Sequence, residues 1–133
     1  SNAAGCRYCQ AHTANSAQEN DVSAEKIQAV FEFESSELFS EKEKAALRVA
    51  LHAGMVPNAV EAEHMNELSK HFSEKQAVEV VAVISLFGFL NRWNDTMATT
   101  LESSPKSFAS QQLASHGWVV GKHEYRECKV GAD

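Results

Sequence analysis

Two cysteines and a histidine within seven residues are the part of this sequence best suited to chemistry. Cys6 and Cys9 stand three positions apart, and His12 follows Cys9 at the same spacing. If the segment is helical, residues three apart share a face, so the two thiols and the imidazole are neighbours. Such a cluster suits dithiol–disulfide chemistry, in which one sulfur attacks, the second resolves the product and a nearby base manages the proton.

A helix that begins near Cys6 would help to activate a thiol. Gly5 precedes the motif, and the chain from Cys6 to about Glu19 has no proline and no further glycine, so one helix can run through the CxxC. A free cysteine has a pKa of about 8.5 and is mostly protonated at neutral pH. Because unpaired N–H groups at a helix start lower a thiol pKa, we expect activation here.

The cysteine pair also allows two other interpretations, a metal site and an inert helical pair. A structural zinc site needs four ligands, and the chain offers no second CxxC. Cys128 and His123 could contribute only if the C-terminal tail folded back. We therefore predict no bound metal and no cofactor, and we interpret Cys128 as a spare thiol.

Composition excludes several classes of function. The chain has 133 residues, of which 44% are hydrophobic, as expected for one soluble globular domain. Its 12 basic and 18 acidic residues give a formal charge of −6, so a nucleic-acid partner is not expected. Three cysteines without a secretory signal favour a reducing compartment, the cytoplasm. The most apolar stretch, residues 78–90, is too short and too polar for a membrane span.

The domain boundaries follow from the two ends of the sequence. Residues 1–3 (Ser-Asn-Ala) are typical of the remnant of a cleaved expression tag, residues 4–123 form the domain, and residues 124–133 form a C-terminal tail. A tag so close to the CxxC leads to the hypothesis that the sequence was cut from a longer protein, which would shorten the domain at its N-terminus.

Capping signals and apolar periodicity predict an all-α fold of about six helices. Ser40 with Glu43, and Ser73 with Gln76, form capping boxes at two helix starts. The predicted helices are 6–19, 24–34, 41–53, 59–71, 74–101 and 106–115, with a loop-like close at Gly117–Gly121. The helix over 74–101 is apolar nearly all round, which predicts burial on every side, partly by a partner subunit.

The remaining polar candidates are interpreted as structural. His52, His64 and His71 have polar neighbours on helices, and His116 and His123 flank the closing loop. Tyr8 is expected to pack at an interface more than to line a pocket. The end of the apolar helix carries a group of polar residues that could form a pocket rim or an intersubunit salt bridge, with the structural role favoured: Asn91, Arg92, Asn94 and Asp95.

Three segments together resemble the carboxymuconolactone decarboxylase superfamily, and most closely its alkyl hydroperoxide reductase D-like (AhpD-like) branch. They are CRYCQAH, then FSEKQAVEVVAVISLFGFLNRWNDTM, then GWVVGKH. The resemblance implies an AhpD-like helical domain that forms trimers or hexamers. It also implies peroxidase or disulfide-reductase activity of an antioxidant type, with a peroxide substrate and a thiol or disulfide electron-donor protein. Cys9 would attack the peroxide, Cys6 would resolve the product to a disulfide, and His12 would relay protons.

The sequence departs from this family pattern at two points. Many relatives have a histidine four residues after the second cysteine, where this chain has Thr13. The family glutamate upstream of the CxxC has no counterpart here, so Glu79 or a carboxylate of a neighbouring subunit would replace it. The alternatives are a lactone-processing decarboxylase, which needs no dithiol, and an oligomeric binding module whose CxxC is vestigial or holds a metal.

Overall fold

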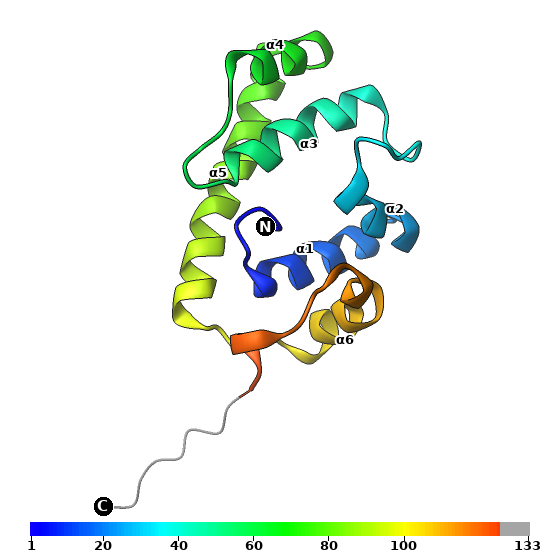
Figure 1. The fold of residues 1–133 in the computed structure, drawn as a ribbon, viewed down its shortest axis with the longest axis vertical. Coiled ribbons are helices and arrows are strands. Elements are labelled where there is room, and N and C mark those ends of the chain that lie inside the picture. The colour runs from blue at the N-terminus through cyan, green and yellow to red at the C-terminus, as the bar shows by residue number, and fades with distance from the viewer. Residues whose placement is uncertain (126–133) are drawn as a thin grey trace, which may run out of the picture.

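The structure is a computed structural model of the chain, and it describes residues 1–125. Within these residues all regular structure is helical, with six α-helices and no β-strand, which confirms the predicted all-α fold. Figure 1 shows the long helix α5 on one side, with α3 and α4 near one end and α1 and α6 near the other. The elements are α1 (Arg7–Glu19), α2 (Ala24–Ala29), η1 (Val30–Glu32), α3 (Glu41–Ala53), α4 (Ala62–His71), α5 (Glu74–Met97), α6 (Ser103–Gln112), η2 (Ala114–His116) and η3 (Gly121–His123).

Local side-chain caps fix several helix starts at their predicted positions. Ser40 and Ser73 cap α3 and α5, each in a complete capping box with the residue three positions later. The Ser23 hydroxyl caps α2 without a capping box, by accepting the N–H of Lys26. A cap depends only on residues within one turn, so the sequence alone is sufficient to predict it.

Two predicted helices are shorter than expected. Helix α2 ends at Ala29 and continues only as a 3₁₀ turn to Glu32, so the prediction of a helix to Glu34 is wrong. Helix α4 begins at Ala62 instead of Ala59. The Asn58 Oδ1 atom accepts the N–H of Val60 at 2.9 Å, and this local turn keeps the chain non-helical for three more residues.

The junction between α5 and α6 also differs from the prediction. Helix α5 ends at Met97, not near Leu101, because Ala98 adopts a left-handed conformation with φ 49°. Helix α6 then begins at Ser103, before Pro105. A proline in the first turn of a helix interrupts no hydrogen bond, which is why the helix can start upstream of it.

Helix α1 is the central element, in contact with α2, α5 and α6. Its small buried residues Ala11 and Ala14 allow close approach and pack with Ala109 of α6 in one apolar cluster. Trp118 belongs to the same cluster, and its indole N–H donates to the carbonyl of Arg7 at 3.0 Å. The C-terminal segment is therefore fastened to the first turn of α1, next to the two cysteines.

Helix α5 connects the two halves of the fold, because it contacts α1, α3 and α4. In a single copy of the chain, one side of α5 packs against the other helices and the opposite side is exposed. The prediction that α5 is buried on every side is therefore wrong for a single copy. Only Asn91 is fully buried, and no helix within residues 1–125 is long and apolar enough to cross a membrane. The exposed apolar side chains on α5 are Val78, Val81, Val83, Leu86, Phe89, Trp93 and Met97.

Replacing Glu43 with glutamine is expected to destabilise the protein near neutral pH but not in strong acid. Glu43 binds the Lys26 ammonium at 2.6 Å and accepts the N–H of Ser40 at 2.9 Å. The Lys26 bond, followed by the Ser40 bonds, lowers the pKa of Glu43 from an ordinary 4.5 to about 2. Its contribution is therefore complete above about pH 4.5 and is lost as the pH falls toward 2.

Urea unfolding at about pH 7 and about pH 2 measures this dependence. We expect Glu43→Gln to lose about 0.5–1 kcal/mol at the higher pH, because glutamine can keep the capping box but loses the ion pair with Lys26, and to lose little at the lower pH. Glu41→Gln on the same helix turn is the matched control, because the ion pair that Glu41 forms within residues 1–125 is the longer one with Lys44, at 3.5 Å. Equal losses for Glu43→Gln at both pH values would contradict the assignment.

Candidate functional site

Cys6 is the N-cap of α1, which confirms that the first helix begins at the CxxC. Gly5 precedes it with a positive φ of 72°, a conformation that favours glycine and directs the chain into the helix. The Cys6 Sγ atom accepts the N–H of Cys9 at 3.3 Å. Cys6 is completely buried. Its sulfur thus occupies the position where a helix presents unpaired N–H groups.

Cys9 lies one turn further along α1 and is also buried. Its Sγ atom accepts a weak hydrogen bond from the Asn94 Nδ2 group of α5 at 3.7 Å. Burial, and then the hydrogen bond and charge of Cys6, raise the pKa of the Cys9 thiol to about 12. At a helix start we expect a lowered thiol pKa, and the raised pKa of Cys9 is the opposite. Burial disfavours the Cys9 thiolate more strongly than the nearby N–H groups favour it.

His12 shares an edge of α1 with Tyr8, and both contact Glu102. The His12 Nε2 atom lies 2.7 Å from Glu102 Oε2, and the Tyr8 hydroxyl donates to Glu102 Oε1 at 3.1 Å. Burial raises the pKa of Glu102, but hydrogen bonds from its own backbone, His12 and Tyr8 outweigh it and lower that pKa. Burial, and then Glu102, raise the pKa of Tyr8. Glu102 is thus a carboxylate partner of the predicted proton relay, whereas Glu79 is exposed on α5.

His123 is the site residue that sequence reasoning missed. It is 1% exposed, and its Nδ1 atom lies 2.8 Å from the carbonyl of Thr99. A carbonyl only accepts, so Nδ1 carries the proton and Nε2 has a free lone pair. Nε2 has no hydrogen-bond partner within residues 1–125. One donor atom each of Cys6, Asp95 and His123 lie within 4.8 Å of one another.

Asp95 completes this group from the end of α5. Its Oδ1 atom lies 3.8 Å from His123 Nε2, and its Oδ2 atom binds the Lys122 ammonium at 2.7 Å. The backbone fixes His123 as well, because the N–H of Leu101 donates to its carbonyl at 2.9 Å. The sequence contains two signals of this group, the four polar residues at the end of the apolar helix and the histidine after Gly-Trp-x-x-Gly-Lys, but both were interpreted as structural from the sequence.

The same three residues form the donor set best suited to a metal in the described part of the chain. Sulfur, imidazole nitrogen and carboxylate oxygen are all zinc ligands, but the group provides only three of the four ligands that a structural zinc site needs. His123 was a conditional ligand in the sequence interpretation of a zinc site, and Cys128 lies outside the described residues. The residues can thus serve either proton transfer or cation binding.

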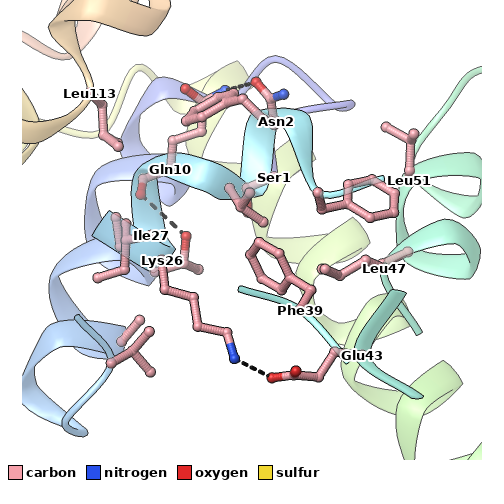
Figure 2. Close-up of a pocket in the computed structure, with 18 of the residues that line it drawn as sticks. Ser1, Asn2, Gln10, Lys26, Ile27, Phe39, Glu43, Leu47, Leu51 and Leu113 are labelled. Atoms are coloured by element: carbon pink, nitrogen blue, oxygen red, sulfur yellow. Dashed lines mark hydrogen bonds and ion pairs between the residues drawn. The ribbon is translucent and has the colours of Figure 1, made fainter. Parts of the chain in front are cut away.

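Two hollows lie beside this site. A cavity of about 420 Å³ lies between α1, α2 and α3, and most of its lining is apolar. Its polar groups include the Lys26–Glu43 ion pair and the hydrogen bond from Gln10 to Asn2 (Figure 2). A second, open groove runs between α5, the end of α3 and the N-terminal segment, and Asp95 lines it. Neither cysteine lines either hollow, but Asp95 lines the groove and has an oxygen within 4.8 Å of the Cys6 sulfur.

The segment that carries the dithiol is also the part of the chain that a family model matches. Residues 1–52 match the model described as the carboxymuconolactone decarboxylase family, and the match includes Cys6, Cys9 and His12. Residues 1–52 are thus assigned to the carboxymuconolactone decarboxylase superfamily. This superfamily includes AhpD-like proteins, so the resemblance found in the sequence is confirmed at that level.

The known proteins that are similar in sequence to this chain are longer than it is. YnjA of Escherichia coli (strain K12), an uncharacterised protein, is 32% identical over 92 residues, 69% of this chain and 50% of YnjA. YdfG of Bacillus subtilis (strain 168), also uncharacterised, is 26% identical over 91 residues, 68% of this chain and 60% of YdfG. The chain thus spans about half to three fifths of the length of these relatives.

Two crystal structures of one enzyme resemble the fold closely. The apo debrominase Bmp8 has a TM-score of 0.78 and 38% identity, over 83% of this chain and 59% of that chain. A cysteine-to-alanine variant of Bmp8 in complex with 2,3,4-tribromopyrrole has a TM-score of 0.78 and 37% identity, with the same coverage. This chain therefore spans about three fifths of the length of Bmp8.

Proposed function

We propose that this protein is a dithiol oxidoreductase, an AhpD-like peroxidase in which Cys6 and Cys9 become a disulfide as a hydroperoxide is reduced. The observation that carries the proposal is the buried pair of sulfurs one helical turn apart, next to an imidazole with a free lone pair. One thiolate attacks a peroxide oxygen, the O–O bond breaks, and a sulfenic acid and an alcohol form. The second thiol displaces water and closes the disulfide.

The cycle needs an external reductant to return the disulfide to the dithiol. A thiol or disulfide electron-donor protein supplies the two electrons by thiol–disulfide exchange through a mixed disulfide. This requirement is met in a reducing compartment, and we therefore propose that the protein works in the cytoplasm. The superfamily resemblance assigns the attack to Cys9, the resolving role to Cys6 and proton transfer to His12. These assignments remain predictions.

A second candidate reaction uses the same two thiols on a carbon–bromine bond. The likeness to the debrominase Bmp8 is the observation that favours it. Oxidation of the dithiol to the disulfide would supply two electrons, replace bromine by hydrogen on an aromatic ring and release bromide. The apolar cavity of about 420 Å³ beside α1 is of a size and lining that accept a small aromatic molecule.

Thiol counting and mass analysis test the proposal directly. In a Cys128→Ser background, an alkyl hydroperoxide is expected to remove two thiols per chain and to give a Cys6–Cys9 disulfide. Addition of 2,3,4-tribromopyrrole with bromide detection tests the second candidate. If neither compound oxidises the pair, the protein is not a dithiol oxidoreductase. Stoichiometric zinc in the untreated protein would instead support a binding module, and lactone turnover without the dithiol would support the decarboxylase alternative.

We further propose that the protein functions as a homo-oligomer, a trimer or a hexamer. The argument rests on α5, whose apolar residues lie exposed at three- and four-residue intervals, as in Leu86, Phe89, Trp93 and Met97. Such a continuous stripe on a long helix is an association surface in soluble proteins. A second copy of the chain would cover it with an equivalent face.

A further inference from the structure

We propose that Cys6 is the attacking thiol of this enzyme and that His123, positioned by Asp95, is the base that deprotonates it. The inference rests on the proposed dithiol function and reverses the order of the two sulfurs that the family resemblance implies. It also assigns the proton transfer to an imidazole from the C-terminal segment instead of the CxxC helix. The geometry of Cys6, His123 and Asp95 points to this arrangement.

The Cys6 sulfur lies at the start of α1, where it has a backbone hydrogen-bond donor. Sγ accepts the N–H of Cys9 at 3.3 Å, at the start of a 13-residue helix. A hydrogen bond from a backbone N–H becomes stronger when the acceptor is a thiolate. The Cys9 sulfur, one turn inside the helix, has instead the neutral amide of Asn94 at 3.7 Å.

The imidazole of His123 is oriented to take the proton. Because Nδ1–H is used on the Thr99 carbonyl, only Nε2 can act as the base. Nε2 is buried without a hydrogen-bond partner in the described chain. Such an atom lowers stability, and a role in catalysis explains why it is retained. A donor atom of Cys6 lies within 4.8 Å of one of His123, and Asp95 Oδ1, 3.8 Å from Nε2, stabilises the imidazolium that forms when the thiol proton is transferred.

Other charged and titratable groups around His123 either orient Asp95 or lie further away. Lys122 holds Asp95 Oδ2 at 2.7 Å, and the Tyr8 ring lies 5.8 Å from the imidazole ring. The Ser1 amino group is near enough to both sulfurs to interact with their charges. The Tyr8 hydroxyl is engaged with Glu102, so it does not compete for Nε2.

The proton and electron balance of the step is complete. The Cys6 proton moves to His123 Nε2, the thiolate attacks the terminal peroxide oxygen, and the leaving alkoxide receives that proton. Cys9 keeps its proton until its sulfur attacks the Cys6 sulfenic acid, and that proton leaves with the hydroxide as water. The high pKa of Cys9 suits this second role, because a protonated thiol does not compete for peroxide. The net reaction consumes one peroxide and two thiols and yields an alcohol, water and the disulfide.

Peptide mapping distinguishes the two sulfurs, because trypsin cleaves after Arg7 and separates them. In the full chain with Cys128→Ser, limiting iodoacetamide at neutral pH is expected to label the Cys6 peptide at least about ten-fold faster than the Cys9 peptide. With limiting peroxide and dimedone, the sulfenic-acid adduct is expected on Cys6 in Cys9→Ser. Faster labelling of Cys9, or an adduct on Cys9 in Cys6→Ser, overturns the proposal. Alkylation needs no peroxide, so it tests the inference even if the peroxidase proposal fails.

A variant of the base tests the role of His123. His123→Asn keeps an amide donor for the Thr99 carbonyl and removes Nε2. We expect the alkylation rate of Cys6 at neutral pH to fall about ten-fold and the pH dependence of that rate to shift to higher pH. Asp95→Asn is expected to move the profile in the same direction by less. His116→Gln is the control, because His116 lies in the same segment, exposed and stacked on Phe31. An unchanged Cys6 profile in folded His123→Asn overturns the assignment, and if that variant does not fold, an unchanged profile in Asp95→Asn overturns it.

Discussion

Replacing Trp118 with alanine is expected to lower the free energy of unfolding by about 3–5 kcal/mol, the usual loss for a large buried aromatic residue. Trp118 is 3% exposed in the apolar cluster with Ala11 and Leu113. Its indole N–H also satisfies the carbonyl of Arg7, which the variant leaves without that donor. The same side chain holds the segment that carries His123 against α1, so the loss extends to the site.

Urea or thermal unfolding followed by circular dichroism measures this effect. Trp118→Phe keeps most of the ring and loses the hydrogen bond, so it should lose about 1–2 kcal/mol. The adjacent Val119→Ala is the matched control, because Val119 is exposed and its removal should change stability by less than about 0.5 kcal/mol. Similar losses for Trp118→Ala and Val119→Ala would show that the segment is not anchored as described.

Placing a charge on the exposed face of α5 is expected to dissociate the protein. Phe89 is 60% exposed, and its ring centroid lies 6.0 Å from that of Trp93. Burial of such side chains by a second copy contributes about 1.5–3 kcal/mol each, whereas an unpaired glutamate inside the interface costs about as much. Phe89→Glu should therefore weaken association by about 100-fold or more.

Sedimentation velocity across a concentration series measures the change. The wild-type chain is expected to sediment as a trimer or hexamer, and Phe89→Glu as a monomer or a concentration-dependent mixture. Lys75→Glu is the control, because Lys75 is an exposed polar residue in the first turn of the same helix. A monomeric wild-type chain at all concentrations would refute the homo-oligomer.

Local interactions explain why the helix starts were predictable. The caps at Ser40 and Ser73 use residues within one turn, and the spacing of Cys6 and Cys9 places both sulfurs on one face once α1 forms. The errors were also local in origin. Asn58 forms a turn that competes with helix, and Ala98 takes a left-handed conformation that no apolar pattern encodes.

The site was only half predictable, because its remaining groups come from distant parts of the chain. Glu102 lies 90 residues from His12, and their contact depends on how α6 packs against α1. His123 was interpreted as structural, because an isolated histidine near a chain end gives no sign of what it will face. The docking of Trp118 on α1, together with the hydrogen bonds of His123 to Thr99 and Leu101, brings His123 to Cys6.

The sequence by itself determined the all-α class, the placement of the CxxC at a helix start and the superfamily, since each depends on residues close together in the chain. The tertiary structure decided what surrounds the dithiol. It buries both sulfurs, raises the pKa of Cys9 to about 12 and supplies Asp95, Glu102 and His123 as the polar groups around the motif. Burial and long-range contacts set these properties, and both arise only when helices that are distant in the sequence pack together.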